Sequence, residues 1–168
     1  LLFAAAAALV CLPYRAAGWN LVAGFLTYGR EWRNNESLYA LLVAATRDER
    51  VATGVALGGV AGLALHCAGE RTEPLRATYL LVAAVLLLSP SVFPWYVTWL
   101  VPFLCFFPNP AWLLLTATVL LSYHVLIGYT STGAWRYTPG LVWLEYVPVY
   151  ALLLTRFLLS PVAWPERS

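Results

Sequence analysis

Long apolar runs constrain this chain more than any other feature of its sequence. Residues 51–68, 111–129 and 141–159 are almost free of charge. Each run has about the 18 residues or more that a helix needs to cross the hydrocarbon core of a bilayer. Because lipid cannot satisfy backbone N–H and C=O groups, such runs must be helical. The sequence therefore predicts an all-α fold, a polytopic transmembrane helical bundle.

Composition supports a membrane partner and excludes several classes of protein. Of the 168 residues, 61% are hydrophobic and only 11% are charged, and the mean hydropathy is +0.73. An ordinary soluble domain is therefore excluded. The net charge of +2 offers no basic field for nucleic acid. Cys11, Cys67 and Cys105 each lie alone in apolar sequence, which indicates small packed hydrophobes rather than disulfides or metal ligands.

A fourth apolar stretch, residues 86–102, is broken by Pro90 and Pro94. Each proline removes a backbone donor and disfavours helix at the residue before it. We expect a helix-turn-helix here, with limbs at 77–88 and 97–107 and its tip at one membrane face. Trp95, Tyr96 and Trp99 favour that boundary because their rings are amphipathic.

Residues 13–50 carry too much charge to cross hydrocarbon. We interpret them as an extracytoplasmic loop with short interfacial helices at 21–28 and 38–45, followed by transmembrane helices within 51–159. The chain does not begin with Met, and residues 1–12 are expected to end a spanning helix. We therefore expect 1–168 to form a single transmembrane domain that is a C-terminal fragment. Gly54, Gly58 and Gly62 lie four apart and permit close helix approach.

The arginines do not follow the usual positive-inside distribution. If the C-terminus is cytoplasmic, four arginines lie on the inner side, at positions 71, 76, 156 and 167. Six lie on the outer side, at positions 15, 30, 33, 47, 50 and 136, which is the reverse of the usual excess inside. Either the topology is inverted or the outer arginines serve another purpose, such as binding a phosphate. We prefer the second interpretation, on the following grounds.

Three short motifs resemble a family of bacterial membrane enzymes. Each has a counterpart in the GT-C type glycosyltransferases. The first, Trp32-Arg33-Asn34-Asn35-Glu36-Ser37-Leu38-Tyr39, resembles their Trp-Arg-Phe-Asn-x-Ser-Leu-Phe motif. The second, Ser89-Pro90-Ser91-Val92-Phe93-Pro94-Trp95-Tyr96, resembles Ser-Pro-x-x-His-Pro-Trp-Tyr, and the third, Trp143-Leu144-Glu145-Tyr146-Val147-Pro148, resembles Trp-x-Glu-Tyr-x-Pro. The chain is thereby similar to the polyprenyl-phosphate-sugar-dependent, mannosyltransferase-like group. It departs at Asn34, where the motif has Phe, and at Phe93, where it has His.

The resemblance implies the C-terminal part of a glycosyltransferase in the bacterial inner membrane, a multi-pass protein. Such an enzyme moves a sugar from a polyprenyl-phosphate donor to a glycan or lipid acceptor at the outer face of the membrane. In the mannosyltransferase-like group that the motifs resemble, the sugar is mannose. A carboxylate takes the acceptor's proton while lipid phosphate leaves the anomeric carbon. The family's base is an Asp in the first outer loop, upstream of this chain, so the chain is expected to be inactive alone.

The resemblance also names candidate substrate-binding residues. Arg33 is the first candidate for the leaving phosphate, with Arg30 and Arg15 behind it, because arginines aimed at developing charge lower the barrier. Sugar contacts are expected from Trp32, Asn35, Ser37, Trp95 and Tyr96. Ordinary structural roles compete with these assignments: arginines pair with headgroups or acids, the aromatic residues form a membrane belt, and Asn35 or Ser37 caps the helix that begins near residue 38.

Glu145 and His124 each lie a few residues inside the outward end of a predicted span, where an ionisable group is costly. They are expected either to pair with each other or to take part in substrate binding.

No cofactor is evident from the sequence, and the use of a divalent metal is left open. A transporter or a non-catalytic assembly subunit is the alternative function. Polar residues gather at one membrane face and no internal repeat is visible, which favours the enzyme.

Overall fold

The computed structural model describes residues 2–18, 23–24, 27, 33–136 and 138–159. The chain divides into two compact units, Leu1–Arg33 and Asn34–Ser168. The first unit contains α1 (Leu2–Cys11) and the 3-10 helix η1 (Leu12–Ala17). Pro13 lies at the change from α to 3-10 geometry, since it cannot donate the next helical hydrogen bond. The helix expected at 21–28 lies largely outside the described residues.

The second unit begins with two helices joined by a short turn, α3 (Leu38–Thr46) and α4 (Glu49–Gly69). The carboxylate of Asp48 caps α4 by accepting from the N–H groups of Arg50 and Val51 at 2.7 and 3.3 Å. Tyr39 ties α3 to α4 through a 2.9 Å hydrogen bond with Thr53. Residues 38–45 are therefore helical as expected, and α4 is the first helix long and apolar enough to span a membrane.

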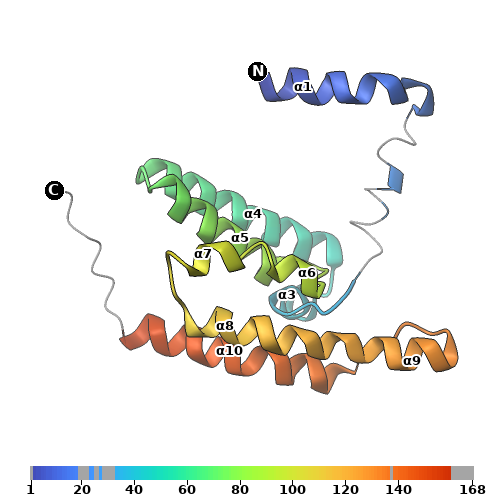
Figure 1. Ribbon diagram of the computed structural model, residues 1–168, viewed down its shortest axis with the longest axis vertical. Helices are drawn as coiled ribbons and strands as arrows, with labels where there is room; N and C mark the ends of the chain where they lie inside the picture. Colours follow the sequence, from blue (N-terminus) through green and yellow to red (C-terminus); the bar gives the residue numbers. More distant parts are fainter. Residues whose placement is uncertain (1, 19–22, 25–26, 28–32, 137, 160–168) are drawn as a thin grey trace. The chain divides into compact units, whose positions relative to one another are not determined.

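The helix α5 (Pro74–Leu88) returns alongside α4 and leads to the tip (Figure 1). Glu73 caps it by accepting from the N–H groups of Leu75 and Arg76, both at 2.9 Å. The helix ends at Leu88, one residue before the Ser89-Pro90 bond, as the prolines predict. Ser89 then stabilises the turn, because its hydroxyl donates to the Ser91 carbonyl and accepts from the Ser91 N–H.

The returning limb differs from the expected continuous helix over 97–107. It consists of two single-turn helices, α6 (Pro94–Val97) and α7 (Val101–Leu104). Within this limb the N–H groups of Trp99, Leu100 and Phe103 bond to carbonyls three residues back. Pro102 has no N–H, so the carbonyl four residues before it loses its α-helical partner and the limb tightens into turns.

The remaining helices form two long rods that lie side by side (Figure 1). The first rod runs from Pro110 to Thr132 as α8 (Pro110–Thr118), the 3-10 segment η2 (Val119–Tyr123) and α9 (His124–Thr132). The second rod is α10 (Pro139–Leu159), which holds Pro148 within it. Both rods are long and apolar enough to span a membrane, as the sequence predicted. The described part of the chain is thus an all-α membrane bundle, with one isolated bridge between Asn34 and Ser91.

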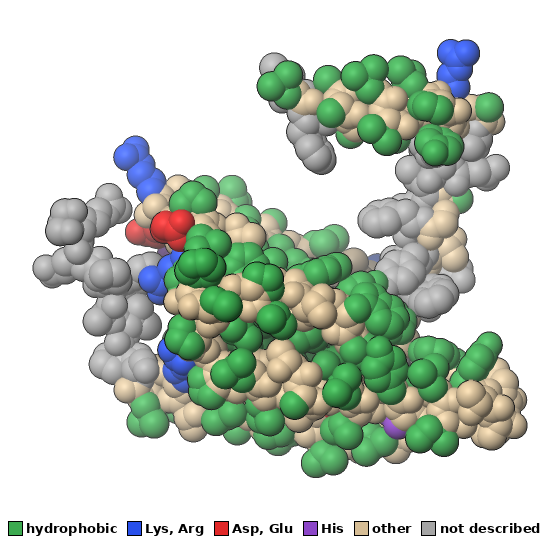
Figure 2. All heavy atoms as spheres, in the orientation of Figure 1, with side chains coloured by type: hydrophobic (Ala, Val, Ile, Leu, Met, Phe, Trp, Pro, Cys, Tyr) green, Lys and Arg blue, Asp and Glu red, His purple; other side chains and the backbone are tan. Residues whose placement is uncertain are grey.

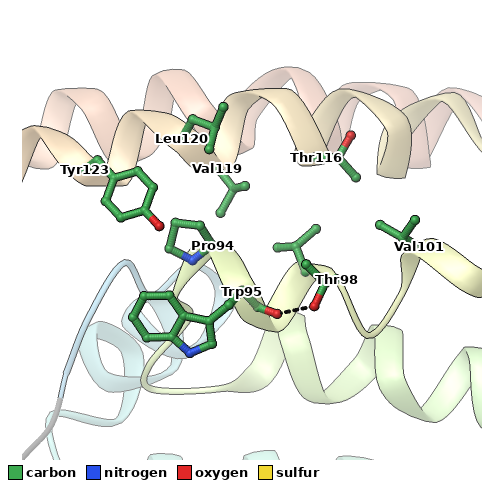
Figure 3. A pocket seen from close by; sticks show the side chains of 9 residues that line it. Pro94, Trp95, Thr98, Val101, Thr116, Val119, Leu120 and Tyr123 are labelled. Carbon is green, nitrogen blue, oxygen red and sulfur yellow. Dashed lines mark hydrogen bonds between the residues drawn. The ribbon is translucent and has the colours of Figure 1, made fainter.

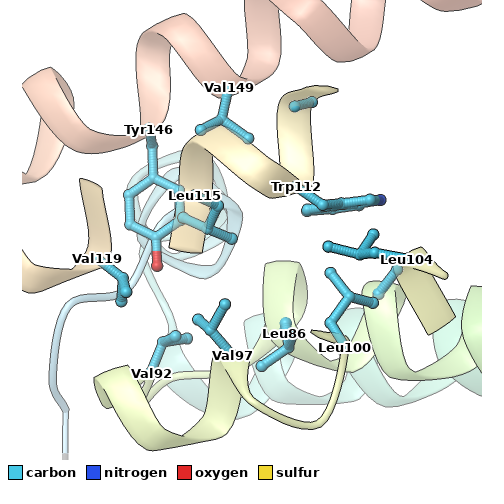
Figure 4. Packing of buried hydrophobic residues seen from close by; sticks show 12 residues of the cluster. Leu86, Val92, Val97, Leu100, Leu104, Trp112, Leu115, Val119, Tyr146 and Val149 are labelled. Carbon is cyan, nitrogen blue, oxygen red and sulfur yellow. The ribbon is translucent and has the colours of Figure 1, made fainter. Parts of the chain in front are cut away.

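The main core lies where the tip limb meets the two rods (Figure 4). Leu100 is fully buried, Leu115 and Tyr146 are 1% exposed, and Trp112 is 4% exposed. These side chains come from the returning limb, α8 and α10, so the core fixes the tip against both rods. Outside the core the helix surfaces are broadly hydrophobic, and on the face shown in Figure 2 charged side chains gather near the turn between α4 and α5. A second charged group, residues 47–50, is exposed at the start of α4. That distribution suits a bundle covered by lipid.

The glycine face of α4 is open in this structure. A Cβ built on Gly54, Gly58 or Gly62 would meet nothing within 4 Å among the described residues. The packed face of α4 instead carries Ala52, which is fully buried, and Ala56, which is 7% exposed. Close approach of another helix over the three glycines therefore stays a prediction.

A part-buried hydrogen bond between α5 and α8 gives a first stability prediction. The indole Nε1 of Trp112 donates to the hydroxyl of Tyr79 at 2.8 Å, and Trp112 is almost wholly buried. Tyr79→Phe leaves that N–H without its acceptor and is expected to destabilise the fold by about 1–2 kcal/mol. The free energy of unfolding in detergent measures this loss. In the Trp112→Phe background the same change should cost much less, and equal costs in both backgrounds would contradict the prediction.

Candidate functional site

Two loop segments far apart in the sequence meet at the tip end of the bundle. The N–H of Asn34 donates to the Pro90 carbonyl at 3.0 Å, and the N–H of Val92 donates to the Asn34 carbonyl at 2.7 Å. The Asn34 side chain donates to the Val92 carbonyl at 3.4 Å and accepts from the Trp135 indole at 3.3 Å. Asn34, where the family motif has Phe, therefore holds residues 34–37 against the proline-broken tip.

Asn35 joins this segment to α10. Its amide Nδ2 donates to Oε1 of Glu145 at 2.9 Å, and its carbonyl accepts from the Tyr146 hydroxyl at 3.2 Å. Asn35 has a φ of +52°, a left-handed conformation that Asn adopts more readily than most residues. All three residues are buried, with Glu145 fully so. The first and third motifs, which are 110 residues apart, thus make one cluster.

This cluster keeps two buried oxygen acceptors without hydrogen-bond partners. They are Oδ1 of Asn35 and Oε2 of Glu145, so each member of the bonded pair has one oxygen unused. The Tyr150 hydroxyl is also buried close to Ser37 and Glu145, without the geometry of a hydrogen bond. Buried polar atoms are nearly always paired, and an unpaired one costs about 1–3 kcal/mol. Such oxygens can accept hydrogen bonds from hydroxyl groups or coordinate a cation.

Ser37 stands at the N-cap position of α3 but does not cap it. Its hydroxyl donates instead to the Leu87 carbonyl at the end of α5, at 3.3 Å. The expectation that Ser37 caps the helix is therefore wrong, as is a cap by Asn35, whose side chain is bonded to Glu145. The physical reason is that α5 ends beside this turn. The Leu87 carbonyl lies in the last turn of α5, where carbonyls have no N–H partner within the helix, so it can accept from Ser37.

The expected pairing of His124 with Glu145 is also wrong. Nδ1 of His124 lies 2.8 Å from the Leu121 carbonyl, and Nε2 accepts from the N–H of Thr138 at 3.0 Å. One ring nitrogen therefore bonds to backbone of its own rod and the other to backbone just before α10, so His124 links the two rods. Glu145 receives its hydrogen bond from Asn35.

The aromatic residues of the tip stack on one another. Phe93 and Trp95 are parallel with ring centroids 4.4 Å apart, and Tyr96 lies 4.8 Å from Trp99. Trp95 and Trp99 remain about half exposed, whereas Phe93 is buried. Phe93 occupies the position of the motif's His and supplies an apolar ring there instead of a hydrogen-bond donor. The exposed rings suit either a membrane belt or a sugar surface.

The arginine candidates are not placed against this cluster. Arg30 and Trp32 lie outside the described residues. Arg33 is described as half-buried and interacts within the chain, but it belongs to the first unit together with Arg15. Their roles toward substrate stay predictions. Among the described residues no three His, Cys, Asp or Glu side chains gather to hold a metal ion.

Two cavities lie beside the tip, between α6 and the rod α8–η2–α9. The larger has a volume of about 290 Å³ and is lined by Trp95, Thr98, Thr116, Leu120 and other residues (Figure 3). The smaller, of about 140 Å³, is lined by Asn34, Phe93, Trp135 and residues of η2 and α9. Pro94, Trp95 and Tyr123 line both, so the two cavities are neighbours.

Sequence reasoning missed several members of the site. It did not assign Asn34 or Trp135 a role, and it did not foresee that Tyr146 would bond to the Asn35 carbonyl. A usable signal was present for Tyr146, since it follows Glu145 inside the third motif. Asn34 gave no such signal because it departs from its motif.

Comparison with known families decides which group of proteins this is. The family model described as the MptB C-terminal domain matches residues 37–165, which is most of the chain. The chain belongs to the MptB C-terminal domain family. The match includes the tip, Glu145 and His124, whereas Arg30, Trp32, Arg33 and Asn35 precede it. Comparisons with curated proteins and with solved structures gave no match.

Membership in the MptB family confirms the coarser part of the prediction. The chain is a mannosyltransferase-like membrane region of glycosyltransferase type, and its partner is the lipid bilayer. Helices able to span a membrane agree with a multi-pass protein.

Proposed function

We propose that this MptB-like region serves a membrane enzyme that transfers mannose from a polyprenyl-phosphate donor to a glycan or lipid acceptor. The reaction would take place at the outer face of a bacterial inner membrane. The observation that carries the proposal is the family match over residues 37–165, which includes the tip and α10. The GT-C motifs around Asn35, Tyr96 and Glu145 add support, because two of these residues meet in one buried cluster.

The chemistry of the tip end fits a sugar phosphate. The unused oxygens of Asn35 and Glu145 can accept hydrogen bonds from sugar hydroxyls, and the exposed ring of Trp95 can stack on a pyranose face. Arg33, with Arg30 and Arg15, would stabilise charge on the leaving phosphate. We expect inversion at the anomeric carbon, with a carboxylate taking the proton of the attacking hydroxyl.

The test follows a labelled sugar in membranes that contain the complete natural protein. Polyprenyl-phosphate-[¹⁴C]mannose is supplied as the donor, and GDP-[¹⁴C]mannose serves as the control. We expect label in a new glycosidic bond from the lipid donor alone, and none in membranes without the protein. Transfer from GDP-mannose alone would overturn the donor assignment. Label that crosses the vesicle membrane without a new bond would identify a transporter instead.

A further inference from the structure

We propose that the buried oxygens of Asn35, Glu145 and Tyr150 bind a monovalent metal cation, Na⁺ or K⁺, between residues 34–37 and α10. Both segments would share the bound cation, which would therefore hold the first motif against the third. The site goes beyond the proposed transfer reaction and does not depend on it. Three features favour the cation: the burial of the Glu145 charge, the oxygens that have no hydrogen bond, and the chemical type of these oxygens.

Glu145 is a buried carboxylate without a cationic partner in the described part of the chain. Its side chain is fully buried, and the hydrogen bond that it accepts at 2.9 Å comes from the neutral amide of Asn35. The Tyr146 hydroxyl, which also lies near it, is neutral too. Removing a charge from water is costly, and buried charges in proteins are paired or coordinate metals. Ionisable groups inside a membrane follow the same rule.

Asn35 and Glu145 each keep one oxygen beside their shared hydrogen bond. Oδ1 of Asn35 and Oε2 of Glu145 are buried and have no hydrogen-bond partner. Each belongs to the same amide or carboxylate group as an atom of the 2.9 Å bond, so the two oxygens lie within one small region. The Tyr150 hydroxyl, which is near Ser37 and within electrostatic reach of Glu145, is a third buried oxygen without a hydrogen bond. All three can coordinate a cation.

The type and charge of these oxygens favour a monovalent ion. Carboxylate, amide and hydroxyl oxygens are hard ligands, which suit alkali and alkaline-earth cations better than zinc or copper. A single carboxylate balances a single positive charge, whereas a divalent ion would leave a net charge buried. Mg²⁺ also loses its waters reluctantly and is usually held together with substrate phosphates. A proton on Oε2 supplies one donor, which cannot serve both remaining oxygens.

Cation binding is compatible with the sugar contacts proposed above. Carboxylate and amide oxygens each have two acceptor positions, so a cation on one side leaves the other for a sugar hydroxyl. The contacts to the cation come from the protein itself, so its effect on stability can be measured without any substrate.

The test follows thermal unfolding of the complete natural protein in detergent while NaCl or KCl replaces N-methylglucamine chloride at constant ionic strength. We expect a saturable rise in the unfolding temperature, of about 5 °C at roughly a hundredfold excess over the dissociation constant. Glu145→Gln should abolish the rise, because it removes the charge. In N-methylglucamine chloride alone, this variant should unfold at or above the wild-type temperature. Glu70→Gln is the matched control, because Glu70 is exposed at the end of α4, and the rise should persist there.

Tyr150→Phe tests the third oxygen while the charge and the aromatic ring are kept. The salt concentration that gives half of the rise should increase about tenfold, because one ligand to the cation is lost. Titration calorimetry with NaCl gives a readout that does not require unfolding. We expect a saturable heat of binding in the wild type that is absent from Glu145→Gln.

No rise with either salt, or an equal rise in Glu145→Gln, would overturn the proposal. A rise with MgCl₂ or CaCl₂ alone would contradict the monovalent assignment. A rise on acidification that is independent of the metal cation would assign a proton to the cluster instead. An unchanged half-rise concentration in Tyr150→Phe would contradict the three-oxygen site.

Discussion

Glu145→Ala is expected to destabilise the second unit, Asn34–Ser168, by about 2–4 kcal/mol, one of the two largest effects that this structure predicts. The substitution removes the acceptor of the Asn35 amide, which is buried and bonded to Oε1 at 2.9 Å. It also opens a cavity beneath residues 34–37, which are held at the tip partly through this bond. Thermal unfolding of the purified protein in detergent measures the loss. Leu144→Ala is the matched control, because Leu144 is the neighbouring residue and is 60% exposed.

Glu145→Gln separates the structural role of this residue from a functional one. The glutamine carbonyl still accepts from Asn35, and its amide replaces Oε2, which has no partner, with a donor. We expect unfolding at or above the wild-type temperature. If a substrate or cation uses the carboxylate, the same variant should lose most of its transferase activity although it is folded. Equal stability of the alanine, glutamine and Leu144→Ala variants would contradict the structural role.

The membrane spans were predictable because their physical cause is local. A span needs only an apolar run of sufficient length, and residues 51–68, 111–129 and 141–159 each form part of a helix of that kind. Helix ends at prolines were predictable for the same reason, as α5 shows at Leu88. The broken limb after the tip was not predicted, since its turns depend on how the carbonyls before Pro102 are satisfied.

The site was predictable in its members but not in its pairings. The motifs selected Asn35, Ser37 and Glu145, and the cost of an ionisable group within a span selected His124; all four have hydrogen bonds at the tip end. Which partner each takes depends on tertiary packing, because the Asn35–Glu145 bond joins residues 110 positions apart. Equal depth of two residues in a membrane, the basis for expecting Glu145 beside His124, does not fix which faces of their helices meet. Only the packing of α10 against α8 and residues 34–37 settles that.

Arg33→Ala is expected to lower the kcat of mannose transfer by about 10²- to 10³-fold, with little change in the KM for donor. The reason is that a guanidinium aimed at the leaving phosphate gains most when the glycosidic bond breaks and charge grows on oxygen. The measurement is single-turnover and steady-state transfer of labelled mannose in membranes, after confirming that the variant inserts normally. Arg50→Ala is the control, because Arg50 is an exposed arginine at the start of α4.

A headgroup-binding role for Arg33 makes different predictions from a phosphate-binding role in catalysis. A lysine retains the charge and would satisfy a lipid headgroup, so Arg33→Lys would restore normal transfer if anchoring were the function. Lysine cannot reproduce the two-pronged donation of a guanidinium to a phosphate, so in catalysis Arg33→Lys should recover only part of the rate. Unchanged transfer by Arg33→Ala, or a loss equal to that of Arg50→Ala, would remove Arg33 from the mechanism and leave Arg30 and Arg15 as the remaining candidates.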